Sequence, residues 1–195
     1  SKKKSETRKK IRSISGELIE LYSSRSKIQG TAYKDFEEEL RFALDFPYTL
    51  TEDQEKTIKE IENDLKNTVP MDRLLCGDVG YGKTEVAFRA MFKAVINGFQ
   101  VAYLCPTTIL SKQQHTSALE RFKDFPVRIE LLNRFVSQKN ITRILKDLEN
   151  GRVDIIIGTH KLLNEKIKYK KLGLLVIDEE QRFGVSHKEK IKKMK

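Results

Sequence analysis

A run with three glycines, ending in a lysine and a threonine, occupies residues 77–84, which read GDVGYGKT. It fits the pattern G-x-x-x-x-G-K-[ST] at every fixed position, follows a short apolar segment and precedes a helical pattern. Such glycines let successive main-chain N–H groups point at one anion, and the positive end of the following helix adds to this attraction. The run therefore predicts a triphosphate site, whose expected nucleotide-binding residues are Gly77, Asp78, Val79, Gly80, Tyr81, Gly82, Lys83, Thr84 and Glu85.

A cluster of acidic residues directly follows the apolar segment 174–177. Alone, it is typical of a solvated loop. About 95 residues after a complete phosphate-binding run, it predicts the second half of the same site. We expect Asp178 to hold Mg²⁺ through water, together with the Thr84 hydroxyl, and Glu179 to be the base that orients the attacking water. Lys83 reaches the outer phosphates, and Gln181 is placed to report the state of the γ-phosphate.

The segment before residue 55 carries two interpretations of the same side chains. Thr51 and Gln54 have the spacing of a capping box, which satisfies main-chain N–H groups at the start of a helix and needs no ligand. Alternatively, the Gln54 amide, which both donates and accepts, recognises the edge of adenine while Phe46 packs on the ring. The phosphate-binding run nearby favours the second interpretation, so ATP is the expected nucleotide.

Short apolar runs alternate with amphipathic helical patterns from residue 50 onward. Such alternation predicts an α/β fold in which a parallel sheet is covered by helices on both faces, with ligands beyond the carboxyl ends of the strands. The expected strands are 73–76, 101–104, 127–132, 153–157 and 174–177, and the expected helices are 52–66, 84–97, 110–122 and 138–149.

The first 45 residues have a different pattern. Ile11, Ile14, Leu18 and Leu21 form one stripe of a basic helical arm. A second short helical pattern follows in Phe36, Leu40 and Ala43, and Pro47 ends the appendage. The chain is therefore divided into an arm or linker, residues 1–45, and a nucleotide-binding domain, residues 46–195.

Composition narrows the class of protein. Hydrophobic residues make up 38% and charged residues 34% of the 195, which excludes collagen-like and wholly disordered chains. No apolar run approaches the roughly 18 residues of a membrane span, and Cys76 and Cys105 form no metal or disulfide motif, so we expect a cytoplasmic protein without membrane partners. The net charge of +10 lies at the two ends, which supports polyanion binding only weakly. The missing initiator Met indicates a piece of a longer protein.

The order of these motifs resembles the first motor domain of superfamily 2 helicases and translocases, a RecA-like domain. Within that superfamily, residues 46–190 closely resemble the bacterial transcription-repair coupling factors, through the strings FPYTLTEDQ, MDRLLCGDVGYGKTEVA, PTTIL, FPVRIELLNRF, GTHKLL and LGLLVIDEEQRFGV. The resemblance implies an ATP-driven translocase on double-stranded DNA that displaces stalled RNA polymerase and recruits excision repair, both partners binding through other domains. It also implies DNA-backbone contacts from Thr107, Thr108, Arg134, Thr159 and His160.

Alternatives to several of these inferences remain. Thr107 and Thr108 also fit a helix N-cap, and His160 alone fits a surface position. Asn133 stands where the family tends to have Ser, which puts the local turn in doubt. The family's Ser-Ala-Thr motif and second motor domain are absent from the sequence, so we expect weak nucleotide binding and little turnover. Two rival functions remain: a fork-reversing DNA helicase, and an interaction module that docks through residues 1–30.

Overall fold

The computed structural model describes residues 33–66, 74–77, 83–164 and 166–178. A five-stranded sheet lies at its centre, and every strand pair in it is parallel. The strand order is β1-β5-β2-β4-β3, so the fifth strand along the chain lies between the first and the second. The strands are β1 (Leu74–Gly77), β2 (Gln100–Leu104), β3 (Ile129–Leu132), β4 (Ile155–Gly158) and β5 (Leu172–Asp178).

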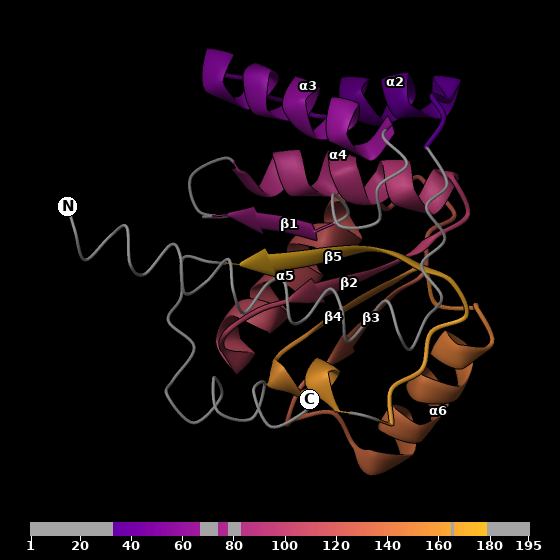
Figure 1. Cartoon of the computed structure of the whole chain (residues 1–195). Coiled ribbons are helices and arrows are strands. Elements are labelled where there is room, and N and C mark those ends of the chain that lie inside the picture. Colours follow the sequence, from indigo (N-terminus) through magenta and orange to yellow (C-terminus); the bar gives the residue numbers. More distant parts are fainter. Residues whose placement is uncertain (1–32, 67–73, 78–82, 165, 179–195) are drawn as a thin grey trace, which may run out of the picture.

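Helices cover both faces of this sheet. One face packs against α4 and the end of α5, and the other face packs against α6 and the short 3-10 helix η2. Two more helices, α2 and α3, lie on the far side of α4 from the sheet (Figure 1). The helices are α2 (Glu37–Leu44), α3 (Glu52–Lys66), α4 (Lys83–Ile96), α5 (Thr108–Arg121), α6 (Gln138–Glu149) and η2 (His160–Leu163).

Burial on both faces explains why β2, β4 and β5 have largely apolar sequences. Along β2, Val101 and Tyr103 face the core under α4, whereas Ala102 and Leu104 face the core under α6. A strand with two buried faces has no solvent-facing positions for polar residues. The fold class expected from the sequence, a parallel sheet with helices on both faces, is thus confirmed.

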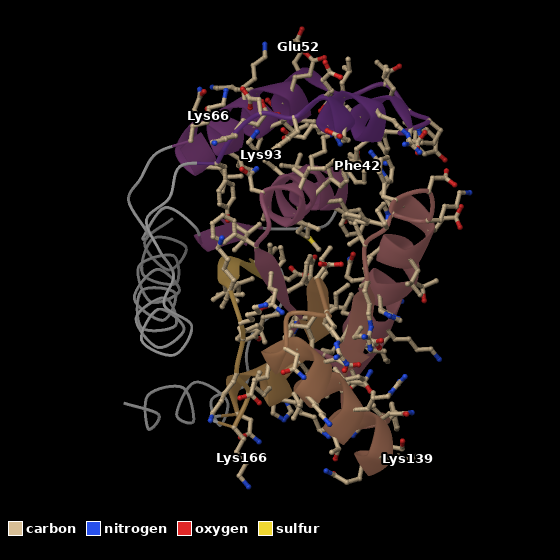
Figure 2. All side chains as sticks on the ribbon, turned by 90° about the vertical axis from the view of Figure 1, so that its right-hand side faces the viewer. Phe42, Glu52, Lys66, Lys93, Lys139 and Lys166 are labelled. Carbon is tan, nitrogen blue, oxygen red and sulfur yellow. The ribbon has the colours of Figure 1, made fainter. Side chains whose placement is uncertain are left out.

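The segment that precedes the phosphate-binding run packs tightly on α4. Phe42 of α2 is buried, and its ring stacks on that of Phe92, with centroids 4.3 Å apart. The ammonium of Lys93 contacts Asp35 at 2.7 Å and Glu39 at 2.9 Å. In Figure 2, Phe42 and Lys93 are labelled in the region where the outer helices α2 and α3 meet α4. Residues 33–44 are therefore held to the sheet domain by both apolar and ionic contacts.

The face that α2 buries differs from the expected one. The sequence pattern favoured a stripe of Phe36, Leu40 and Ala43, but Phe36 and Leu40 are 38% and 66% exposed. The helix instead turns Phe42 inward, because aromatic rings of α4 and of the segment after α5 meet it there. The helix itself was predicted correctly, and its orientation was not.

Candidate nucleotide and DNA site

The carboxyl ends of the strands bring the two halves of the predicted nucleotide site together. Gly77, the first residue of the phosphate-binding run, is the register partner of Asp178 across the β1–β5 pair. Paired residues of neighbouring parallel strands lie about 5 Å apart. In Figure 1, β1 and β5 point toward the same edge of the sheet. Residues 101 positions apart in the sequence therefore stand side by side at the edge where α4 begins.

Part of the predicted site lies outside the described residues. The structure describes Gly77 as the last residue of β1 and Lys83 as the first residue of α4, with Thr84 half-buried in its first turn. The predicted site residues that fall outside the described ranges are Asp78, Val79, Gly80, Tyr81, Gly82, Glu179 and Gln181. The first part of the arm, with its stripe from Ile11 to Leu21, also falls outside them.

Asp178 is a buried carboxylate at the end of a central strand, with 2% of its surface exposed. Burial raises the pKa of the Cys105 thiol, and the charge of Asp178 adds to that shift. The pKa of Tyr103 is raised for the same two reasons, with a contribution from Cys105. Cys105 and Tyr103 therefore stay neutral beside the Asp178 carboxylate, in surroundings of low polarity. A divalent cation is the counterion that such a group favours.

The structure contains the capping box that the sequence allowed. The Gln54 N–H donates to Thr51 Oγ1 at 3.2 Å, and the Thr51 N–H donates to Gln54 Oε1 at 2.8 Å. This pair fixes the beginning of α3. Phe46 lies half-buried a few residues earlier, with Tyr48 edge-on at 5.5 Å between ring centroids. Adenine recognition by Phe46 and Gln54 stays a prediction.

Glu85, in the first turn of α4, has partners that the sequence did not reveal. Its carboxylate is 5% exposed and accepts hydrogen bonds from Arg89 and from Arg121. Arg89 lies one turn further along α4, but Arg121 comes from the end of α5. No motif marks Arg121, so only the packing of α5 beside α4 identifies it.

The other strands carry the predicted DNA-facing residues to the same edge. Thr107 and Thr108 follow β2 and begin α5, where the Thr107 hydroxyl accepts a hydrogen bond from Leu110 N–H at 3.2 Å. Thr159 and His160 follow β4, the former buried and the latter half-buried at the start of η2. The N-cap interpretation of Thr107 is thereby confirmed. Thr107 is nevertheless exposed, so the turn that it caps stays accessible to solvent.

Asn133 holds the turn that follows β3. Its side-chain Nδ2 donates to Ser111 Oγ at 3.3 Å, and its Oδ1 accepts from Phe135 N–H at 2.9 Å. The Ser111 hydroxyl donates in turn to Thr108 O at 2.7 Å. The buried amide thus joins the turn that carries Arg134 to the first turn of α5. The asparagine that put this turn in doubt forms its main support.

Arg134 and Phe135 project from that turn. Phe135 is 74% exposed, and the Arg134 guanidinium lies 4.8 Å from its ring centroid. Phe135 and the outer side of α5 line a surface groove of about 730 Å³. The groove lies beside the predicted DNA contacts, and its lining residues are Thr108, Ile109, Lys112, Gln113, Gln114, Thr116, Ser117 and Phe135.

Comparison with known proteins decides the family. The DEAD/DEAH box helicase family matches residues 51–195, about three quarters of the chain. The chain belongs to the DEAD/DEAH box helicase family. Within this helicase family, it is 55% identical over all 195 residues to the transcription-repair-coupling factors of Staphylococcus aureus (strain USA300) and Staphylococcus haemolyticus (strain JCSC1435). The chain spans 17% of the length of these curated relatives.

One solved structure supports the fold. The structure of RecG bound to a three-way DNA junction matches with a TM-score of 0.71 and 36% sequence identity, over 88% of this chain and 24% of that one. The RecA-like fold expected from the sequence is therefore confirmed, as is the resemblance to transcription-repair coupling factors. Among the described helices, none combines the length and apolar character that crossing a membrane requires.

Proposed function

We propose that the chain is the ATP-binding first motor domain of a double-stranded DNA translocase. In the whole protein, this motor couples ATP hydrolysis to displacement of stalled RNA polymerase and to recruitment of excision repair through other domains. The family match and the name shared by the curated relatives support this proposal. The observation that carries it is the register pairing of Gly77 with Asp178, because a motor site needs the phosphate-binding run and the acid at one point.

The residues at this edge suit a magnesium-bound triphosphate. Asp178 offers a buried carboxylate and Thr84 a hydroxyl in the first turn of α4, which are oxygen ligands of the kind that Mg²⁺ prefers. When bound, the cation neutralises charge that develops on the phosphates. Lys83 and the main-chain N–H groups at the start of α4 bind the phosphates, with the positive end of the helix facing the anion.

The remaining catalytic roles follow from the order of the motif. Glu179 accepts a proton from the attacking water and orients it, and Gln181 responds to the γ-phosphate. We propose DNA-backbone contacts for Thr107, Thr108, Arg134, Thr159 and His160, because hydroxyls, N–H groups and a guanidinium bind phosphate oxygens without reading base sequence. On its own, the chain is expected to turn ATP over very slowly, since a motor of this kind needs an arginine from a second domain.

Nucleotide binding by the chain tests the proposal directly. We would titrate ATP with Mg²⁺ into the chain and into Lys83→Ala by isothermal calorimetry, with Lys139→Ala as a matched control on the exposed face of α6. Loss of the charge-assisted phosphate contacts should cost Lys83→Ala about 1.5–3 kcal/mol, or roughly 10–100-fold in affinity. Lys139→Ala should bind like the unmodified chain. Equal affinities in all three proteins would end the proposal.

Catalysis has to be measured in the longer protein. There, Glu179→Gln should keep ATP binding and abolish movement along DNA, because the neutral amide cannot take the proton of the attacking water. Translocation by this variant at the ordinary rate would remove Glu179 from the base role, while leaving the nucleotide site in place.

A fork-reversing DNA helicase is the second candidate function. The match to RecG bound to a three-way DNA junction favours it, because that likeness covers 88% of this chain. The higher identity to the coupling factors favours the first candidate. The first candidate function predicts that the whole protein releases RNA polymerase stalled on DNA. Remodelling of three-way junctions without any release of polymerase would favour the second candidate.

A further inference from the structure

A buried ionic cluster connects the start of α4 with the segment that contains Phe46. At its centre, Glu85 directly follows Thr84 and is 5% exposed. Both of its oxygens are bound by Arg121, through Nη2 at 2.6 Å and Nε at 2.9 Å, and one also accepts from Arg89 Nε at 3.0 Å. A carboxylate buried to this extent requires such partners. Two guanidiniums thus fix the first turn of the helix that follows the phosphate-binding run.

The same two guanidiniums also contact the last turn of α2 and Phe46, which follows it. Arg121 Nη2 donates to the carbonyl oxygen of Phe42, and its guanidinium stacks on the Phe42 ring at 3.8 Å from the centroid. Arg89 Nη2 lies 3.5 Å from the carbonyl oxygen of Ala43. The guanidinium carbons of both arginines lie 5.8 Å from the centroid of Phe46. This Glu85 cluster, made of Glu85, Arg89 and Arg121, therefore joins the first turn of α4 to the residues around Phe46.

The bidentate geometry gives Arg121 a role that a simple charge cannot fill. A guanidinium has five N–H donors in a rigid plane, so it can bind a carboxylate with one edge, donate to a carbonyl and stack on a ring at the same time. Arg121 does all three, with Glu85, Phe42 O and the Phe42 ring. With only 10% of its side chain exposed, it has little freedom to move. This side chain therefore links the first turn of α4 to the last turn of α2, next to Phe46.

We propose that Arg121 is a positioning residue for base recognition, which keeps Phe46 and Gln54 at the correct distance from the phosphate-binding residues Lys83 and Thr84. The inference rests on the proposed function, since it requires an adenine nucleotide at this edge. Arg121 contacts neither base nor phosphate in this scheme. It acts by aligning two parts of the protein that bind opposite ends of one ligand, and misalignment of such parts weakens binding of the whole ligand more than binding of either end.

The test compares ATP with inorganic tripolyphosphate, which has the phosphate chain but no base. Both are titrated with Mg²⁺ into the chain and into Arg121→Met, which retains an apolar stem and leaves Glu85 paired with Arg89. We expect Arg121→Met to bind ATP about tenfold more weakly, with tripolyphosphate affinity within about twofold of the unmodified chain. Arg128→Met is the matched control, because Arg128 pairs with Glu130 and Asp147 away from the cluster. It should leave both affinities unchanged.

Arg121→Lys separates alignment from charge and also serves if Arg121→Met does not fold. A lysine can neutralise Glu85, but it lacks the planar fork that also reaches Phe42 O. We therefore expect ATP binding by Arg121→Lys to stay reduced, by about threefold or more, with tripolyphosphate binding retained. Full recovery of ATP affinity in Arg121→Lys would overturn the inference, because charge alone would then suffice.

Other outcomes distinguish this inference from the proposed function. Equal losses for ATP and tripolyphosphate in Arg121→Met would indicate general damage to the fold and overturn the positioning role. The same conclusion follows if the unmodified chain binds ATP no better than tripolyphosphate, because no base recognition then exists to be aligned. In both cases, the nucleotide site would stand. If the unmodified chain binds neither ligand, the proposed function fails and the inference fails with it.

Discussion

Replacement of Phe42 by alanine should destabilise the whole sheet domain. Phe42 is 1% exposed and contacts three other rings, those of Phe92, Phe122 and Phe125, with centroids 4.3, 4.9 and 5.3 Å away. The Arg121 guanidinium stacks on the same ring. A cavity at this position would therefore remove contacts from α4, from α2 and from the segment after α5 at once.

The magnitude follows from the burial. Truncating a buried phenylalanine to alanine costs about 3–5 kcal/mol, and the upper part of this range applies where neighbouring groups cannot collapse into the space. Three aromatic rings and a paired arginine surround Phe42, and each is held by other contacts, so little collapse is expected. We expect a loss of about 4 kcal/mol in the free energy of unfolding. For a domain of this size, that is a large part of the total stability.

Urea unfolding followed by far-UV circular dichroism measures this loss. Leu44→Ala is the control, because Leu44 lies in the same helix but is 76% exposed, and it should change the free energy of unfolding by less than about 0.5 kcal/mol. The experiment also bears on the division of the chain at residue 46, which stays a prediction. If residues 33–45 form a separable arm, Phe42→Ala will leave the main unfolding transition where it was. That result would refute the inclusion of Phe42 in the core of the sheet domain.

Three further predictions concern single groups. Asn133→Ala should lower the free energy of unfolding in urea by about 1–3 kcal/mol, because it removes the hydrogen bond donated to the buried Ser111 Oγ and the acceptor of the Phe135 N–H. Hydrogen bonding to Lys93 lowers the pKa of Asp35, so its ionised form stabilises the fold above the ordinary value of 3.8 and loses this effect as pH falls through the lowered pKa. The stability difference between the chain and Asp35→Asn should accordingly be present at neutral pH and shrink below 3.8, and a difference that grows on acidification would contradict it. Since burial raises the pKa of Cys105, iodoacetamide at neutral pH should label it in urea but not in the native chain, as measured by peptide mass.

The elements of the fold could be predicted largely because β2, β4 and β5 are buried along their whole length. An apolar run such as 174–177 has few other stable environments in a chain of this kind, and the observed β5 extends it by two residues at its start and one at its end. Glycine-rich and acidic residues at the ends of such runs then fall at one edge of a parallel sheet without further information. The meeting of Gly77 and Asp178 could therefore be expected before the structure was known.

Contacts between distant elements could not be predicted in this way. The orientation of α2 depends on rings that α4 and the residues after α5 supply, and nothing in Phe36, Leu40 or Ala43 reports their position. Likewise, Arg121 and Glu85 lie 36 residues apart, on two helices whose relative rotation is set by packing. Arg121 looks like an ordinary surface charge in the sequence, and Glu85 is marked there only as the end of the phosphate-binding run. The residue that we propose to align the site is thus one that no local pattern marks.

The central place of β5 has a consequence for how the polypeptide matures during translation. Among the described strands, β1 pairs with β5 alone, and β5 also separates β1 from β2. Until the ribosome has released residues 172–178, β1 has no partner among the strands that the structure describes, and Gly77 and Asp178 cannot meet. Among the described strands, the one synthesised first therefore pairs only after the one synthesised last, so nucleotide can stabilise this edge only from that stage of folding onward.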